Sequence, residues 1–97
     1  MLTTELEDLR LTQSLLRQRM RSLEQQAERA EAKAAMWRGA TPGNKEERED
    51  AMRRELAFLD HARRLRARLD EQRAESERLK LLQRRLRARL DDLPLRT

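Results

Sequence analysis

The feature that most constrains the fold of this chain is a heptad repeat, in which apolar residues recur in alternating steps of three and four. In the first third of the sequence the repeat has one polar interruption, at Gln13. Its apolar positions are Leu2, Leu6, Leu9, Leu16, Met20, Leu23, Ala27, Ala30, Ala34 and Trp37. This period matches one face of an α-helix in a coiled coil. The repeat therefore predicts a long helix that packs along a partner helix.

A second heptad repeat occupies the later part of the chain. Its positions are Phe58, Ala62, Leu65, Leu69, Gln72, Ser76, Leu79, Gln83, Leu86, Leu90 and Leu93. We call the positions of both repeats the seam. Three further apolar residues, Met52, Leu56 and Leu59, are slightly out of phase with this run. We interpret them as seam residues displaced by a three-residue stammer.

The segment RGATPGN between the two repeats holds both glycines of the chain and one of its two prolines, and it predicts a turn. Gly39 is expected to end the first helix in the left-handed conformation. Thr4 with Glu7, and Asn44 with Glu47, fit capping boxes at the two helix starts. We predict one module over 1–97, with a helix over about 4–38, a turn at 39–44 and a helix over about 45–93.

A connection of this length predicts an antiparallel hairpin. Folding the chain about residue 41 would pair residues whose numbers add up to roughly 82, such as Met20 with Ala62. The second helix would then extend past the first by about fifteen residues, roughly 22 Å, before Pro94 stops it. Leucines on this overhang, with others near the same end of the first helix, form the predicted interface. These residues are Leu11, Leu15, Leu79, Leu82, Leu86, Leu90 and Leu93.

Leucines without a partner in their own chain predict association with another helix. Two hairpins related by a two-fold axis would bury both overhangs and form a central four-helix segment. The expected fold is therefore all-α, an antiparallel coiled-coil hairpin that dimerises. The expected function is that of an oligomerisation module in a scaffold or adaptor, with a second copy or another helical protein as partner.

The octet RRLRARLD occurs twice, at 63–70 and 84–91, three heptads apart. We interpret its arginines as the charged border of a helix–helix interface, because their aliphatic stems can cover a seam. The alternative is a basic nucleic-acid-binding module, which the formal net charge of +5 favours. This basic face comprises Arg63, Arg64, Arg66, Arg68, Arg84, Arg85, Arg87 and Arg89.

Composition excludes several other classes of function. One Trp, one Phe and no Tyr provide no platform on which bases could stack and no anchors for a membrane surface. The chain lacks cysteine and has one histidine, His61, so we expect no metal site. We find no nucleophile with a neighbouring base and no phosphate-binding glycine loop. We therefore expect no enzyme activity, no cofactor and no small-molecule substrate.

The sequence has neither the pattern of a signal peptide nor an apolar run long enough for a bilayer, which favours a cytoplasmic protein. Its expected outline is similar to that of the antiparallel hairpin modules of Rho effectors. That resemblance is one of shape, and it implies the binding of a small GTPase as a further alternative.

Overall fold

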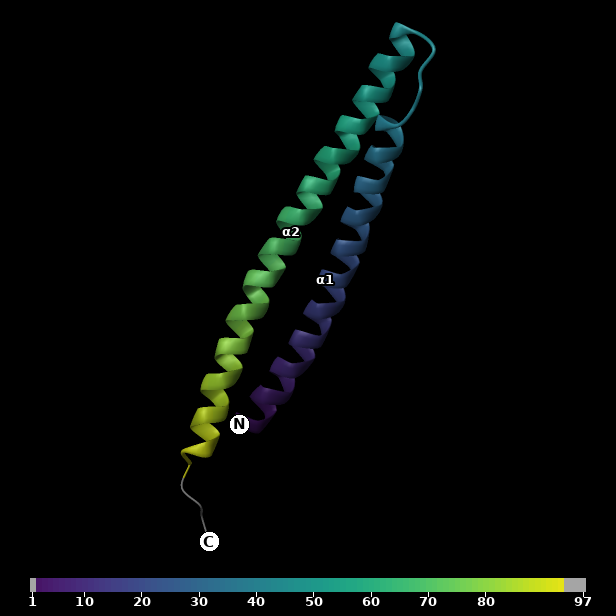
Figure 1. Ribbon diagram of the computed structural model, residues 1–97. Coiled ribbons are helices and arrows are strands. Elements are labelled where there is room, and N and C mark those ends of the chain that lie inside the picture. The colour runs from purple at the N-terminus through teal and green to yellow at the C-terminus, as the bar shows by residue number, and fades with distance from the viewer. Residues whose placement is uncertain (1, 94–97) are drawn as a thin grey trace. The chain divides into compact units, whose positions relative to one another are not determined.

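The chain folds as an all-α helical hairpin in the computed structural model, which describes residues 2–93 (Figure 1). Helix α1 spans Leu2–Arg38 and helix α2 spans Lys45–Asp91. The two predicted helices are confirmed, although α1 begins two residues before Thr4 and α2 ends two residues before Leu93. Pro94, the predicted stop, lies outside the described residues.

The end of α1 differs from the prediction in its local geometry. No described glycine has a positive φ, so the expected left-handed cap at Gly39 is wrong. Instead, the amide of Gly39 donates to the carbonyl of Ala35 at 3.0 Å, and the amide of Ala40 donates to the carbonyl of Trp37 at 3.3 Å. The second bond spans three residues, which tightens the last turn and satisfies a terminal carbonyl without a left-handed residue.

The start of α2 has the predicted cap. The Asn44 Oδ1 atom accepts a hydrogen bond from the amide of Glu47 at 2.8 Å, and the Glu47 carboxylate accepts one from the amide of Gly43 at 2.8 Å. This is a capping box in which the glutamate reaches one residue further back than usual. Glu46 and Glu47 also place negative charge at the positive end of the helix dipole.

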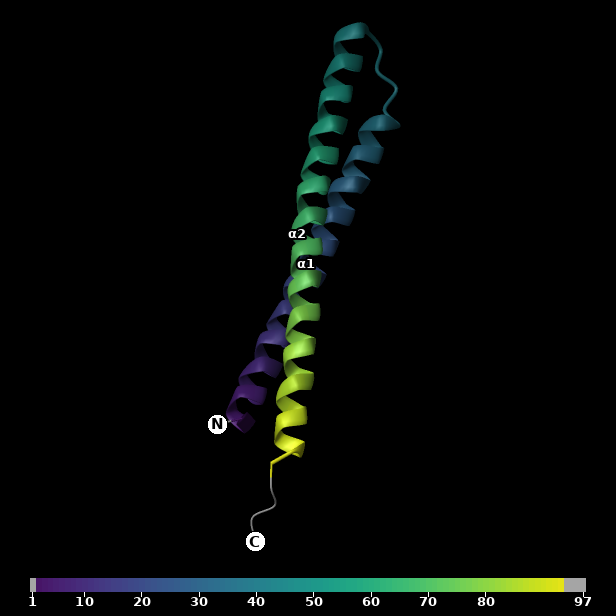
Figure 2. The same ribbon diagram turned by 90° about the vertical axis from the view of Figure 1, so that its left-hand side faces the viewer.

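The two helices form two compact units, which we describe separately. Unit 1 combines Met1–Met20 with Glu71–Thr97. Within it, the start of α1 and the last part of α2 lie side by side in both views (Figures 1 and 2). Five buried leucines, Leu6, Leu9 and Leu16 of α1 with Leu79 and Leu86 of α2, form its core. Half-buried Leu2, Met20 and Leu90 pack against this core.

Unit 2, Arg21–Asp70, has a core made mostly of alanine, which supplies five of its seven buried residues. Its buried residues are Ala27, Ala30, Ala34, Ala51, Ala62, Leu65 and Leu69. The alanines of α1 permit a close approach of α2, because the distance between packed helices depends on the side chains at the contact. Two cation–π contacts cross between the helices: Lys33 lies 5.5 Å from the Phe58 ring centroid, and Arg54 lies 4.7 Å from that of Trp37.

The pairing of the two helices differs from the predicted register. In unit 1, Gln13 is hydrogen-bonded to Gln83, whereas the predicted register would place it opposite Leu69. In unit 2, Glu31 is hydrogen-bonded to Arg66, whereas the prediction places it opposite residue 51. Residues of α1 therefore lie opposite α2 residues that come fourteen or fifteen positions later than predicted. The predicted overhang at the end of α2 is wrong.

The stammer is wrong for the same reason. The heptad repeat of α2 continues without interruption through buried Ala51 and half-buried Glu55, so Met52 and Leu56 are exposed. Figure 1 shows the connection, 39–44, running from the end of α1 to a start of α2 that lies beyond it. The connection keeps its predicted length in this register, and burying one leucine stabilises by about 1.5–3 kcal/mol. The register that buries more leucine is therefore favoured.

Candidate interaction surface

Four leucines within the helical segments of unit 1 remain exposed although the core of the unit is complete. The exposed fractions are 63% for Leu11, 48% for Leu15, 51% for Leu81 and 39% for Leu82. Leu11 and Leu15 are four residues apart and share one face of α1, and Leu81 and Leu82 are consecutive in α2. We call these four residues the leucine patch.

The hydrogen bond between Gln13 and Gln83 shows that the patch occupies one level of unit 1. Leu11 stands two residues before Gln13, and Leu81 and Leu82 directly precede Gln83. Leu15 and Leu82 are each the residue before a seam position. In antiparallel helices the residues that precede seam positions lie on the same side of the pair, and those that follow lie on the other. Leu15 and Leu82 therefore lie on the preceding side, whereas Leu11 and Leu81, each two residues before a seam position, lie on the outer face of their helices.

Charged residues on the same side follow a regular order. Along α1, Glu5 and Asp8 lie on one side of the patch and Arg19 on the other. Along α2, Arg85 and Arg89 lie toward the level of the α1 acids, and Glu75 with its ion-pair partner Arg78 lies toward the level of Arg19. The patch is thus bordered by both signs of charge, in opposite order on the two helices.

The predicted interface residues divide into two groups. Leu11, Leu15, Leu82 and Leu93 are exposed. Leu79 and Leu86 are buried in the core of unit 1, and Leu90 packs against that core, so the expectation that they lack a partner in the chain is wrong. The physical reason is the register, which gives the last part of α2 an α1 segment to pack on. Leu81, which counting heptads places outside the seam and which widens the apolar stripe of the second helix, completes the patch.

The arginine octets do not form one face. The first copy lies in unit 2 and the second in unit 1. In each copy, two arginines precede seam positions and the other two follow them, so the four lie on both sides of the helix pair. In the first copy, Arg64 pairs with Asp60 at 2.7 Å, and Arg66 pairs with Glu31. The four arginines of the second copy have no ion pair among the described residues. These are Arg84, Arg85, Arg87 and Arg89.

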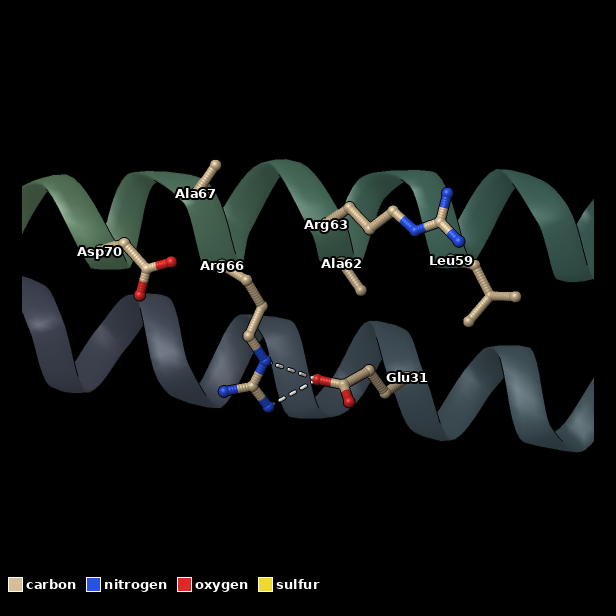
Figure 3. Close-up of a pocket in the computed structure, with 7 residues that line it drawn as sticks. All are labelled: Glu31, Leu59, Ala62, Arg63, Arg66, Ala67 and Asp70. Atoms are coloured by element: carbon tan, nitrogen blue, oxygen red, sulfur yellow. Dashed lines mark hydrogen bonds and ion pairs between the residues drawn. The ribbon is translucent and has the colours of Figure 1, made fainter.

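The pair of Arg66 with Glu31 crosses an open hollow of about 330 Å³ in unit 2 (Figure 3). The Arg66 guanidinium donates two hydrogen bonds to one oxygen of Glu31, from Nε at 3.0 Å and from Nη2 at 2.6 Å. These hydrogen bonds raise the pKa of Arg66, and the negative charge of Glu31 adds to the effect. Figure 3 shows Leu59 and Ala62 pointing toward α1 and Ala67 pointing away from it. The hollow is therefore crossed by an ion pair formed within the chain.

A smaller hollow of about 170 Å³ in unit 2 includes Lys33, Phe58 and His61. Within 2–93, no group of three or more His, Cys, Asp or Glu residues is arranged to hold a metal ion. In the same residues, neither helix has an apolar stretch that would cross a lipid bilayer. The exposed surface of unit 1 is thus the most distinctive candidate site.

Comparison with known proteins gives no relative: no protein-family model, no curated protein and no solved structure matches this chain. The functional argument therefore depends on the chain's own residues.

Proposed function

We propose that this chain is a non-enzymatic, coiled-coil interaction module that self-associates as a homodimer through the leucine patch, in a cytoplasmic scaffold or adaptor. The observation that supports this most directly is the grouping of Leu11, Leu15, Leu81 and Leu82 at one level of unit 1, all exposed. Clustered apolar side chains on a surface mark interaction sites more often than scattered ones do. Burying a leucine fully stabilises by about 1.5–3 kcal/mol, and part of that gain remains for each of these four.

A second copy of the chain is the partner that the surrounding charges favour. A two-fold axis across the patch, perpendicular to the helices, stacks α1 on α1 and α2 on α2 in antiparallel directions. Glu5 and Asp8 of one copy then approach Arg19 of the other. By the same symmetry, Arg89 approaches Glu75. These two borders meet the opposite sign, which disfavours other registers and partners, whereas Arg85 meets Arg78, a cation that is paired with Glu75 in its own helix.

Light scattering coupled to size exclusion tests the proposal. The unmodified chain should have about twice the 11.6 kDa chain mass. The double variant L15E/L82E should run as a monomer that is still helical by circular dichroism. The variant M52E/L56E is the matched control, because it makes the same change at two exposed apolar residues of unit 2 and should remain a dimer. A monomeric unmodified chain at high micromolar concentration contradicts the proposal.

A further inference from the structure

A second exposed surface of unit 1 lies on the side of the helices opposite to the leucine patch. It consists of cations that directly follow seam positions, on a side that also holds three acids, Glu7, Glu77 and Asp91. Arg10 and Arg17 follow Leu9 and Leu16 in α1, and on α2 the residues that follow Leu79, Gln83 and Leu86 are also cations. We call this set the cationic face. Its members are Arg10, Arg17, Lys80, Arg84 and Arg87, and all are exposed.

The register places like charges opposite each other on this face. With Gln13 paired to Gln83, Arg10 lies opposite Arg87 and Arg17 lies opposite Lys80. The equivalent positions in unit 2 hold opposite charges, Glu31 and Arg66, which form an ion pair at 2.6 Å. Like charges at such positions disfavour helix pairing instead of supporting it. An anion bound between them would remove this repulsion.

The cations of this face are also available for binding. Lys80 pairs with Glu77 in its own helix at 3.1 Å. The four arginines of the cationic face, Arg10, Arg17, Arg84 and Arg87, have no ion pair among residues 2–93. The opposite side differs, because its four cations, Arg19, Arg78, Arg85 and Arg89, are matched by four acids, Glu5, Asp8, Glu71 and Glu75. Positive charge in unit 1 is therefore concentrated on one side of the helix pair.

We infer that the cationic face binds the phosphate backbone of double-stranded nucleic acid without sequence preference. The face contains no exposed apolar residue, so an acidic protein helix would gain only surface ion pairs, which contribute little. A polyanion adds the release of condensed counterions, which supplies most of the affinity in non-specific nucleic-acid binding. The two aromatic residues, Trp37 and Phe58, belong to unit 2, so this face offers no stacking for single-stranded bases. The inference is independent of the leucine patch.

Titration of a fluorescent DNA duplex of arbitrary sequence at several salt concentrations tests the inference. The unmodified chain should bind with an affinity that falls steeply with salt. The variant R10Q/R87Q should weaken binding and reduce the slope of log affinity against log salt by about two, since each phosphate contact contributes about 0.9. The variant R29Q/R68Q is the control: it removes the same charge, one from each helix, from residues of unit 2 that precede seam positions and lie outside the leucine patch and its charged border. Its slope should stay near that of the unmodified chain.

A further variant separates binding from folding. Arg87→Glu places an opposite charge across from Arg10 and should raise the melting temperature while weakening duplex binding. Equal losses in the two double variants would show that net charge, not this face, is responsible, and would overturn the inference. Absence of duplex binding at physiological salt, preference for single strands, or tighter binding of polyglutamate than of duplex would also overturn it.

Discussion

Gln13 of α1 donates a hydrogen bond from Nε2 to Oε1 of Gln83 in α2 at 3.1 Å, within the half-buried seam of unit 1. Polar seam residues of this kind lower the stability of a helix pair but specify which register it adopts. Among the described residues, no buried side-chain polar atom lacks a hydrogen-bond partner. The two amides therefore satisfy each other only when the helices are paired in the observed register.

Replacing the two glutamines tests this coupling. Gln13→Leu alone leaves the Gln83 amide without its partner and should cost about 1 kcal/mol, the scale of one hydrogen bond. The double variant Q13L/Q83L should be at least as stable as the unmodified chain, because both polar groups are replaced by apolar ones. Urea unfolding of both single variants and the double variant gives the coupling free energy. Strictly additive effects would contradict the role of the pair.

Core substitutions test the difference between buried and exposed leucines of α2. Leu86→Ala should lower the free energy of unfolding by about 2–5 kcal/mol, because this leucine is buried in the core of unit 1. Leu56→Ala should change it by no more than about 0.5 kcal/mol, because that side chain is exposed. Chemical unfolding measures both. The reverse order would favour the originally predicted register, in which Leu56 lies in the seam.

The ion pair across unit 2 predicts a charge-reversal rescue. Glu31→Arg places like charges opposite each other and should lower the melting temperature. Adding Arg66→Glu restores an opposite pair and should recover most of the loss. Because both side chains are largely exposed, the recovery should weaken as salt is raised. A double variant no more stable than E31R would show that the two residues do not interact.

The pair of Glu75 with Arg78 predicts a small dependence of stability on pH. Hydrogen bonds from Arg78 lower the pKa of Glu75 from its ordinary value of 4.5. A carboxyl whose pKa is lowered on folding stabilises the fold above its ordinary pKa, and this contribution is lost as the pH falls through the lowered value. The melting temperature of the unmodified chain should exceed that of Glu75→Gln at neutral pH, and the difference should shrink in acid. A constant difference from pH 7 to pH 2 would contradict this assignment.

The sequence was sufficient to predict the elements and most of their inward faces, with Met52 and Leu56 as exceptions. The heptad count placed Leu9, Leu16, Leu69 and Leu79 in the seam, and all four are buried. The cap formed by Asn44 was also predicted, because it depends on local chemistry alone. The register was not predicted. A shift of fourteen residues is two complete heptads, so it keeps every seam residue in the seam and changes only its partner across the helices.

The candidate surfaces depend on that missing information to different degrees. The exposure of Leu11 and Leu15 follows from the heptad count of α1 alone, and it was predicted. The burial of Leu86 depends on which α1 residues lie opposite, so sequence reasoning assigned it to the interface. The pairing of Arg10 with Arg87 depends on the register in the same way. Before the register is known, the α1 and α2 residues that together form each surface cannot be identified.

Both proposed surfaces therefore depend on the register, and cross-linking measures it directly. The chain contains no cysteine, so two introduced thiols report on one distance. We predict that Q13C/Q83C reacts rapidly within one chain with a short bifunctional maleimide, while Q13C/L69C does not. Mass spectrometry at dilute concentration distinguishes links within a chain from links between chains. Preferential cross-linking of Q13C/L69C would contradict the observed register, and with it the leucine patch and the cationic face.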